Sequence, residues 1–299
     1  MTYLIDFLKG IIIGIANIIP GVSGGTMAVS LDIYDRLISS ISHLFKNWKA
    51  SLKTLAPILV GAGVGVIAFT YTIEFLLSSY TLPTALAFIG LILGGIPGLW
   101  ESFQKGLETQ KQTISISHII AFTLMFVLVV IILPLLQESG TVLTAIQLDP
   151  LSLIKLFIIG IIASATMIIP GVSGSLILMV LGYYYLIINT ITLFITALRT
   201  GDMDSLLPNF VLLSVFSLGV LIGIFLISKA IEFLFEHYSS VTYSGILGLV
   251  IASPFAILVN TKALNDLQTT QALPFAVVGI VLLVICYYGI YQLGKNETN

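Results

Sequence analysis

Long charge-free apolar runs alternate with short charged segments along this chain. Such runs reach the roughly 20 apolar residues that a helix needs to span the hydrocarbon of a bilayer. Six of them cover residues 54–73, 75–100, 112–137, 205–228, 237–261 and 267–294. The pattern predicts an all-α polytopic membrane protein. Two further charge-free runs, 10–31 and 156–198, differ from the rest because each contains a helix-breaking sequence.

The two unusual runs carry nearly the same octapeptide. IIPGVSGG occupies residues 18–25 and IIPGVSGS occupies residues 168–175. Proline cannot donate to the helix ladder and glycine relaxes the backbone, so the motif is expected to end one helix and begin another. In the first copy, two arms of about ten residues would each cover only about 15 Å of a core about 30 Å thick. The run therefore favours a re-entrant helical hairpin.

The similarity extends beyond the octapeptides. At an offset of 150 residues Gly10 pairs with Gly160 and Tyr34 with Tyr184, and an apolar stripe with helical spacing follows each motif. The first stripe has a polar opposite face, which predicts an amphipathic helix in the membrane interface; it comprises Leu37, Ile38, Ile41, Leu44, Phe45 and Trp48. At an offset of 158, residues 65–80 match residues 223–238. We interpret the chain as two membrane repeats, residues 1–150 and 151–299, that form one transport domain.

Each repeat is predicted to contain a re-entrant helical hairpin, an interfacial amphipathic helix and three transmembrane helices. Three crossings are an odd number, so the second repeat would be inverted relative to the first, as in many transporters. With a cytoplasmic N-terminus, nine Lys and Arg residues fall inside and three outside, as the positive-inside rule expects. The alternative, in which the broken segments cross fully and the N-terminus is outside, gives about eight against four and stays open.

Composition argues against several classes of function. Of the 299 residues, 58% are hydrophobic and 9% are charged, and the net charge is −2. That charge provides no general attraction to nucleic acid. The lone Cys286 lies in an apolar run, which excludes an intramolecular disulfide and argues against a thiolate metal cluster. Neither a metal site nor a cofactor is expected.

The two breaks supply hydrogen-bond donors at membrane depth. A helix that ends inside hydrocarbon leaves backbone groups that protein, water or a ligand must satisfy. The arm after each motif begins with free N–H groups and the positive end of a helix dipole, which suits an anion. The candidate phosphate-binding residues are Asn17, Gly21, Ser23, Gly24, Gly25 and Thr26 in the first copy and Gly171, Ser173, Gly174 and Ser175 in the second. Close helix packing is the alternative for a single motif, but duplication at matched positions favours binding.

Three ionisable residues are further candidates. Glu74 and Glu232 occupy matching positions in two copies of IEFL and are candidates for binding a coupling proton or cation. The alternative is that they are interfacial carboxylates near lipid head groups. Arg36 follows the first motif and could clamp an anion, or it could anchor the cytoplasmic side together with nearby lysines.

An enzyme is not expected. The first motif contains the G-x-S-G pattern of intramembrane serine proteases, which would make Ser23 a nucleophile. Such a nucleophile needs a histidine base, and none of His43, His118 and His237 is clearly placed to serve as one. A lipid phosphatase would need clustered Arg, His and Asp residues, and the sequence shows no such cluster.

The stretch LKGIIIGIANIIPGVSGGTMAV, with Tyr34 downstream, and the stretch MIIPGVSGSLILMVLGYYY resemble a bacterial and archaeal family. It was long called domain of unknown function 368 and is now regarded as polyprenyl-phosphate translocases (PopT). The resemblance covers nearly the whole chain. It implies a flippase in the cell membrane that returns undecaprenyl phosphate from the outer to the cytoplasmic leaflet, where cell-wall synthesis reuses this lipid carrier. The implied function, and the re-entrant elements, are similar to those of the DedA family.

The resemblance also implies a binding role for the residues of both motifs, and less directly for Arg36. The second copy departs at Ser175 and Leu176, where the first has Gly25 and Thr26, so the two sites should not bind equally. A secondary transporter of a small anion or osmolyte uses the same broken helices and is the alternative. The implied partners are undecaprenyl phosphate and membrane lipids, and formation of a homo-oligomer stays open.

Overall fold

The computed structural model describes residues 2–18, 23–132, 135, 146, 148–170, 177–178 and 181–295. Throughout these residues the regular structure is helical. The predicted spans lie in α4 (Trp48–Ser79), α5 (Thr81–Thr109), α6 (Ile116–Val127) with the π-helical turn η1 (Leu128–Ile132), α11 (Met203–Asn260) and α12 (Ala272–Lys295). Four stretches of the described chain are long and apolar enough to cross a membrane: Trp48–Phe69, Thr81–Thr109, Met203–Val259 and Ala272–Gln292. The prediction of an all-helical membrane protein is confirmed.

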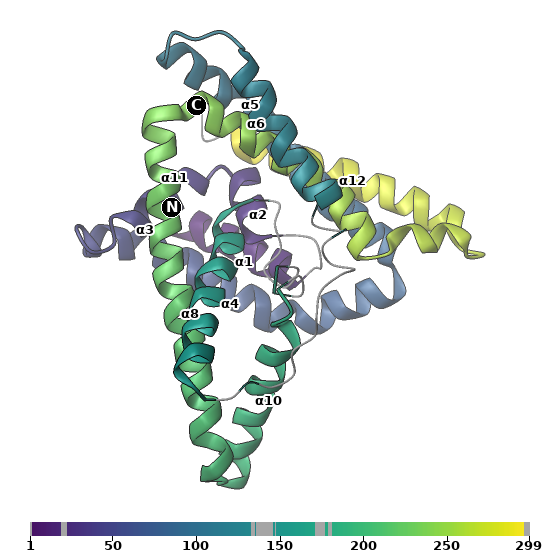
Figure 1. The fold of residues 1–299 in the computed structure, drawn as a ribbon. Coiled ribbons are helices and arrows are strands. Elements are labelled where there is room, and N and C mark those ends of the chain that lie inside the picture. Colours follow the sequence, from purple (N-terminus) through teal and green to yellow (C-terminus); the bar gives the residue numbers. More distant parts are fainter. Residues whose placement is uncertain are drawn as a thin grey trace.

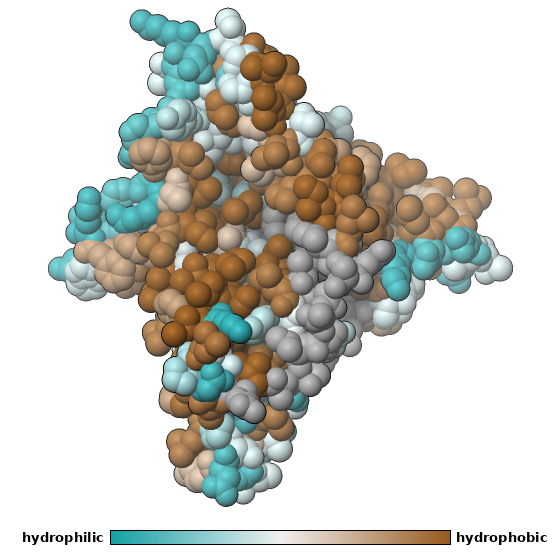
Figure 2. Space-filling model, in the orientation of Figure 1, coloured by the Kyte–Doolittle hydropathy of each residue, from teal (hydrophilic) through white to brown (hydrophobic). Residues whose placement is uncertain are grey.

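Apolar side chains cover much of the surface. Figure 2 shows them across the face in view, with hydrophilic residues gathered toward the ends of projecting helices. Each long helix exposes large apolar residues; examples are Ile67 on α4, Trp100 on α5, Leu221 on α11 and Leu273 on α12. Apolar patches of this extent are unfavourable in water, so hydrocarbon is the solvent that suits this surface.

Helix α11 contains two of the predicted spans. Its 58 residues would measure about 87 Å if straight, almost three times the thickness of hydrocarbon. The backbone leaves helical geometry at Tyr238 (φ −133°, ψ 40°). Gln110, which caps the end of α5, binds both sides of this kink: its Nε2 donates to the carbonyl of His237 (3.1 Å) and its Oε1 accepts from Ser240 Oγ (2.7 Å). The kink divides α11 into 203–237 and 239–260, close to the predicted boundary.

Four close helix pairs organise the bundle (Figure 1). Helix α1 (Thr2–Ile18) packs along α4, α8 (Pro150–Ile168) along α11, α5 along α12, and α6 against α11. Glycines permit this approach, because an added Cβ would lie 2.1–2.3 Å from a backbone oxygen of the partner helix at Gly61, Gly219, Gly90 and Gly248. The last two pairs join the predicted halves to each other, and the 3-10 helix η2 (Ala263–Gln268) connects α11 to α12.

The first predicted break is present. Helix α1 ends at Ile18, and α2 (Gly24–Ser30) begins directly after Ser23. The two arms have 17 and 7 residues rather than about ten each. Helix α1 is longer than expected because its two charges find partners: Asp6 pairs with Arg36, and Lys9 donates to the Leu31 carbonyl. In the second half α8 ends at Ile168, where the second motif begins.

The predicted interfacial helix is shorter than its apolar stripe. Helix α3 (Tyr34–Ser42) ends at Ser42, the chain turns, and α4 starts at Trp48. The predicted continuation is therefore wrong, and Phe45 is 77% exposed. The turn coincides with a contact between His43 Nδ1 and the carboxylate of Glu232 on α11 (3.0 Å), which joins the end of α3 to α11. Its counterpart in the second half, α10 (Tyr184–Thr200), is continuous.

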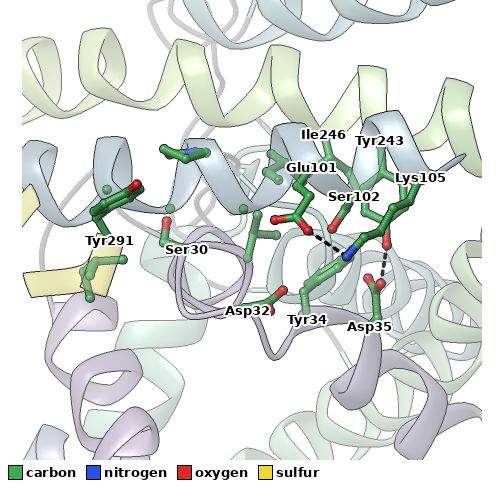
Figure 3. Close-up of a pocket in the computed structure, with 17 residues that line it drawn as sticks. Ser30, Asp32, Tyr34, Asp35, Glu101, Ser102, Lys105, Tyr243, Ile246 and Tyr291 are labelled. Atoms are coloured by element: carbon green, nitrogen blue, oxygen red, sulfur yellow. Dashed lines mark hydrogen bonds and ion pairs between the residues drawn. The ribbon is translucent and has the colours of Figure 1, made fainter. Parts of the chain in front are cut away.

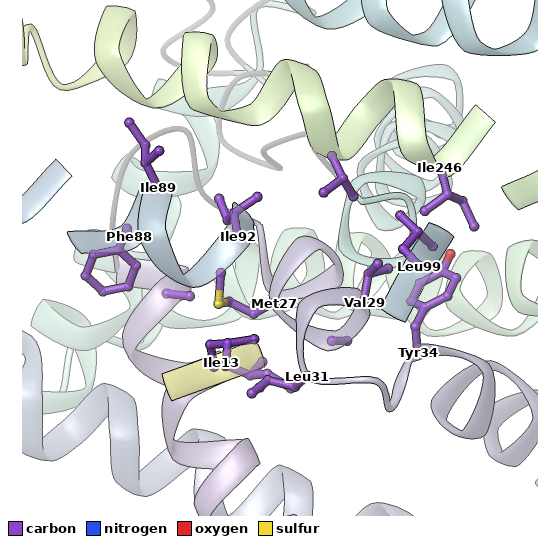
Figure 4. Packing of buried hydrophobic residues seen from close by; sticks show 14 of the residues in the cluster. Ile13, Met27, Val29, Leu31, Tyr34, Phe88, Ile89, Ile92, Leu99 and Ile246 are labelled. Atoms are coloured by element: carbon purple, nitrogen blue, oxygen red, sulfur yellow. The ribbon is translucent and has the colours of Figure 1, made fainter. Parts of the chain in front are cut away.

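Helix α2 lies at the centre of the main hydrophobic core (Figure 4). Six of its seven residues are buried, and Met27 packs in the same cluster as Ile13 of α1 and Ile92 of α5. At Gly95 of α5 an added Cβ would lie 2.2 Å from the Cα of Ser30, so the two helices touch backbone to backbone. An isolated helix this short is unstable. Its neighbours therefore hold the arm in place.

Candidate functional site

Five of the predicted phosphate-binding residues meet at the start of α2: Asn17, Ser23, Gly24, Gly25 and Thr26. Ser23 has an extended backbone, and its Oγ accepts a hydrogen bond from the Thr26 N–H (3.1 Å) and lies 2.9 Å from the Thr26 hydroxyl. Asn17, in the last turn of α1, accepts the Gly24 N–H through Oδ1 (3.0 Å). Ser23 and Thr26 are buried, whereas Asn17 is exposed. Polar side chains from both sides of the break thus cap this helix.

Gly25 places this cap against the second motif. A Cβ added at Gly25 would lie 3.0 Å from the carbonyl oxygen of Ile168 and 3.3 Å from the nitrogen of Pro170. Pro170 is fully buried. The start of α2 therefore contacts the chain at the point where α8 breaks. The remaining predicted motif residues lie outside the described part of the chain: Gly21, Gly171, Ser173, Gly174 and Ser175.

Arg36 does not join this cluster. It forms an ion pair with Asp6, which is eleven residues before Asn17 and therefore about 16 Å away along α1. Lys9, one of the nine Lys and Arg residues assigned to the cytoplasmic side, is 3% exposed and donates to the carbonyl of Leu31 (2.8 Å). Lys9 thus lies at the C-terminal end of α2, where the negative end of the helix dipole favours positive charge.

Of the two glutamates predicted to bind a coupling ion, the structure describes the side chain of Glu232 but not that of Glu74. Glu232 lies on α11 and contacts His43 Nδ1 at 3.0 Å. Glu74 lies on α4, and its side chain is outside the described part of the structure. The structure therefore links Glu232 to the end of α3.

A cavity of about 410 Å³ lies between the end of α2, the start of α3, and α5, α11 and α12 (Figure 3). The Tyr243 hydroxyl donates to the carboxylate of Asp35, and Lys105 Nζ lies 2.8 Å from Glu101. Asp32 is the third carboxylate in the lining. This acidic cavity was not predicted from the sequence, although the stretch LDIYD at residues 31–35, separated from the first motif by five residues, is a signal for it.

The chain matches a known protein family over most of its length. A family model described as VCA0040-like, undecaprenyl phosphate translocase-like, matches residues 13–273. This range contains both motifs, the last turns of α1 and all of α2 to α11. The chain belongs to this family. Membership confirms the expectation of a transporter rather than an enzyme.

Two bacterial relatives of this translocase-like chain are each named polyprenyl-phosphate transporter. The protein from Staphylococcus aureus is 33% identical over 258 residues, which cover 85% of each chain. The protein from Vibrio cholerae is 31% identical over 267 residues, which cover 85% of this chain and 77% of the relative. No solved structure matches the chain.

Proposed function

We propose that the protein moves undecaprenyl phosphate, or a related polyprenyl phosphate, from the outer to the cytoplasmic leaflet of a bacterial cell membrane. The two motifs bind the phosphate head group together. The observation that carries this proposal is the contact of Gly25 with the backbone of residues 168–170, since it joins the two breaks. The family description and the names of the two relatives support the substrate class.

The side-chain oxygen of Asn17, Oδ1, marks a position for a phosphate oxygen. It accepts the Gly24 N–H at the positive end of α2, and a phosphate oxygen in its place would receive the same hydrogen bond. Asn17 is exposed, so its side chain can turn and present its amide N–H groups to the ligand. The hydroxyls of Ser23 and Thr26 lie beside it, 2.9 Å apart, and add polar groups to the same end of α2.

This arrangement addresses the main cost of moving a lipid phosphate. An isolated charge in hydrocarbon is very unfavourable, whereas hydrogen bonds to an ionised group are about twice as strong as neutral ones. The site shelters the head group while the polyprenyl tail remains in lipid along the exposed apolar helices. The protein therefore needs to enclose only a small part of its substrate.

The architecture proposed for this cycle is a pair of inverted repeats, residues 1–150 and 151–299, with a cytoplasmic N-terminus. Equivalent contacts in the two halves support it. A Cβ added at Gly61 would lie 3.1 Å from the Cα of Gly10, and one added at Gly219 would lie 3.3 Å from the Cα of Gly160. These pairs correspond at the offsets of 150 and 158 found in the sequence. Opposed halves would let one site face each leaflet in turn.

The test is flipping in liposomes that contain the purified protein and a fluorescent short-chain polyprenyl phosphate. A membrane-impermeant quencher reports the lipid in the outer leaflet. Asn17→Ala should slow flipping by about tenfold or more, because a hydrogen bond to a charged group contributes about 1.5–3 kcal/mol. Asn47→Ala is the matched control, since Asn47 also precedes a helix but makes no side-chain capping bond.

Equal flipping by the two variants would show that the cap of α2 does not bind the head group. The alternative, a secondary transporter of a small anion or osmolyte, predicts a different pattern for the wild-type protein. It would accumulate a labelled soluble anion such as inorganic phosphate and leave the lipid in its original leaflet.

A further inference from the structure

The acidic cavity beside α2 is chemically unlike the proposed phosphate site. Three carboxylates, those of Asp32, Asp35 and Glu101, share the lining with the single ammonium group of Lys105. A negatively charged lining disfavours an anionic head group. The cavity also adjoins the C-terminal end of α2, where the helix dipole favours a positive charge. Its ligand should therefore be a cation.

Tyr34 provides an independent indication that the cavity takes a ligand. Its side chain is 5% exposed and lines the cavity, and its hydroxyl oxygen has no hydrogen-bond partner among the described residues. Figure 4 shows the ring directed from the start of α3 toward Leu99 and Ile246, which also line the cavity. A buried hydroxyl without a partner is unfavourable, so a bound proton donor or water in this cavity would stabilise it.

The Asp35 carboxylate connects two of the helices that line the cavity. It accepts a hydrogen bond from Tyr243, which connects α3 of the first half to α11 of the second. Asp35 is exposed to solvent, but the surrounding protein partly desolvates its carboxyl and raises its pKa above the usual value; the Tyr243 hydrogen bond opposes this rise, and the charge of Asp32 adds to it. The titratable and charged groups of the cavity are Asp32, Tyr34, Asp35, Glu101, Lys105, Tyr243 and Tyr291, from the α2–α3 turn, α3, α5, α11 and α12.

We propose that this cavity is a proton-binding site of the transport cycle and that the Asp35 carboxylate accepts a proton when the phosphate head group binds. The inference rests on the proposed function. A proton from water forms an O–H bond to a carboxylate oxygen, and the same bond breaks when the head group leaves. The lipid anion and the proton are carried together, so less net charge passes through hydrocarbon.

The geometry of α2 links the two sites. Its seven residues span about 10 Å between the cap and the α2–α3 turn. A phosphate charge separated from Asp35 by roughly the length of α2 would raise the proton affinity of that carboxylate by on the order of tenfold at an effective dielectric constant near 20. By reciprocity, protonation of Asp35 strengthens head-group binding by the same factor.

A proton fits this cavity better than a metal ion. Among the described residues, no three His, Cys, Asp or Glu side chains converge in a way that could hold a metal. The lining instead supplies separate carboxylates and the hydroxyls of Tyr34 and Tyr243. Hydroxyls can both donate and accept, which suits the protonated and deprotonated forms of a neighbouring acid.

The test is accumulation of the fluorescent short-chain polyprenyl phosphate against its own gradient. Liposomes hold an alkaline interior in an acidic medium, and the steady-state share of lipid in each leaflet is measured. For the wild-type protein the lipid should collect in the inner leaflet, whatever the orientation of the protein, because the coupling is thermodynamic. Asp35→Asn should lose this accumulation, while Asp204→Asn, at an exposed aspartate on α11, should keep it.

A second variant separates a proton site from a structural role. Tyr243→Phe removes the hydrogen bond that favours the charged form of Asp35. The midpoint of the pH profile of flipping should therefore move to higher pH than in the wild-type protein. An unchanged midpoint would overturn the proposal, since a structural contact alone would alter the rate without shifting the profile.

The remaining outcomes are also decisive. Wild-type protein that equilibrates the lipid but does not accumulate it under a pH gradient would overturn the proton site and leave the proposed function standing. Accumulation driven by a sodium gradient at uniform pH would assign the cavity to a metal cation instead. Wild-type protein that does not move the lipid at all would refute the proposed function itself.

Discussion

Gly25 is the position where a small change tests the proposed site most directly. A Cβ there would lie 3.0 Å from the Ile168 oxygen and 3.3 Å from the Pro170 nitrogen, compared with about 3.5 Å for a comfortable contact. Gly25→Ala must therefore separate the two motifs by roughly 0.5 Å. Overpacking of this kind lowers the free energy of unfolding by about 1–3 kcal/mol. The higher helix propensity of alanine raises it by up to about 1 kcal/mol. The variant should fold with a net loss of about 2 kcal/mol or less.

Transport should suffer more than folding. A misplacement of about 1 Å in a functional constellation can cost about a hundredfold, so a shift half as large should slow flipping by on the order of tenfold. The assay compares flipping rates and thermal midpoints of Gly25→Ala and Gly63→Ala. Gly63 lies on α4, and a Cβ there has no neighbour within 4 Å. Wild-type flipping by Gly25→Ala would refute the reasoning, because the contact between the motifs would then have no role in transport.

Two further predictions concern stability. Gly61→Ala and Gly219→Ala should each lower the thermal midpoint in detergent by a similar amount, since an added Cβ would lie 2.1 Å and 2.2 Å from a backbone oxygen of the partner helix; a large effect at one site and none at the other would contradict the proposed repeat. Lys9→Met should cost about 1.5–3 kcal/mol, because it removes a charged donor from the buried Leu31 carbonyl. Lys46→Met, at an exposed lysine, is its control, and equal thermal midpoints for the two variants would show that the buried bond contributes nothing.

Part of the candidate site was predictable from local sequence. Proline followed by Gly-x-Ser-Gly indicates a helix end and a cap, and Ser23 does cap α2. Asn17 was a candidate phosphate ligand, and its side chain accepts the Gly24 N–H at this cap. Arg36 had two interpretations, an anion clamp or a cytoplasmic anchor, and in the structure it pairs with Asp6. Proximity along the chain is a poor guide for a long side chain whose partner lies on another helix.

The acidic cavity could not be predicted in this way. Asp35 and Tyr243 come from opposite halves of the chain and meet only because α3 packs on α11. The length of α3 was also misjudged, since the helix ends before its apolar stripe does, at the point where His43 contacts Glu232 of α11. Helical periodicity records which side of a helix is apolar, but it does not record which helix faces it.

The sequence by itself determined the membrane class, the long apolar helices and the ends of α1 and α8 at the two motifs. These depend on hydrophobic length and on proline and glycine, which act through the local backbone. The tertiary structure alone decided that Gly25 touches residues 168–170, that Lys9 is buried beneath α2, and that Asp35 meets Tyr243. Those contacts depend on how closely helix backbones approach, and packing of the whole bundle sets that distance.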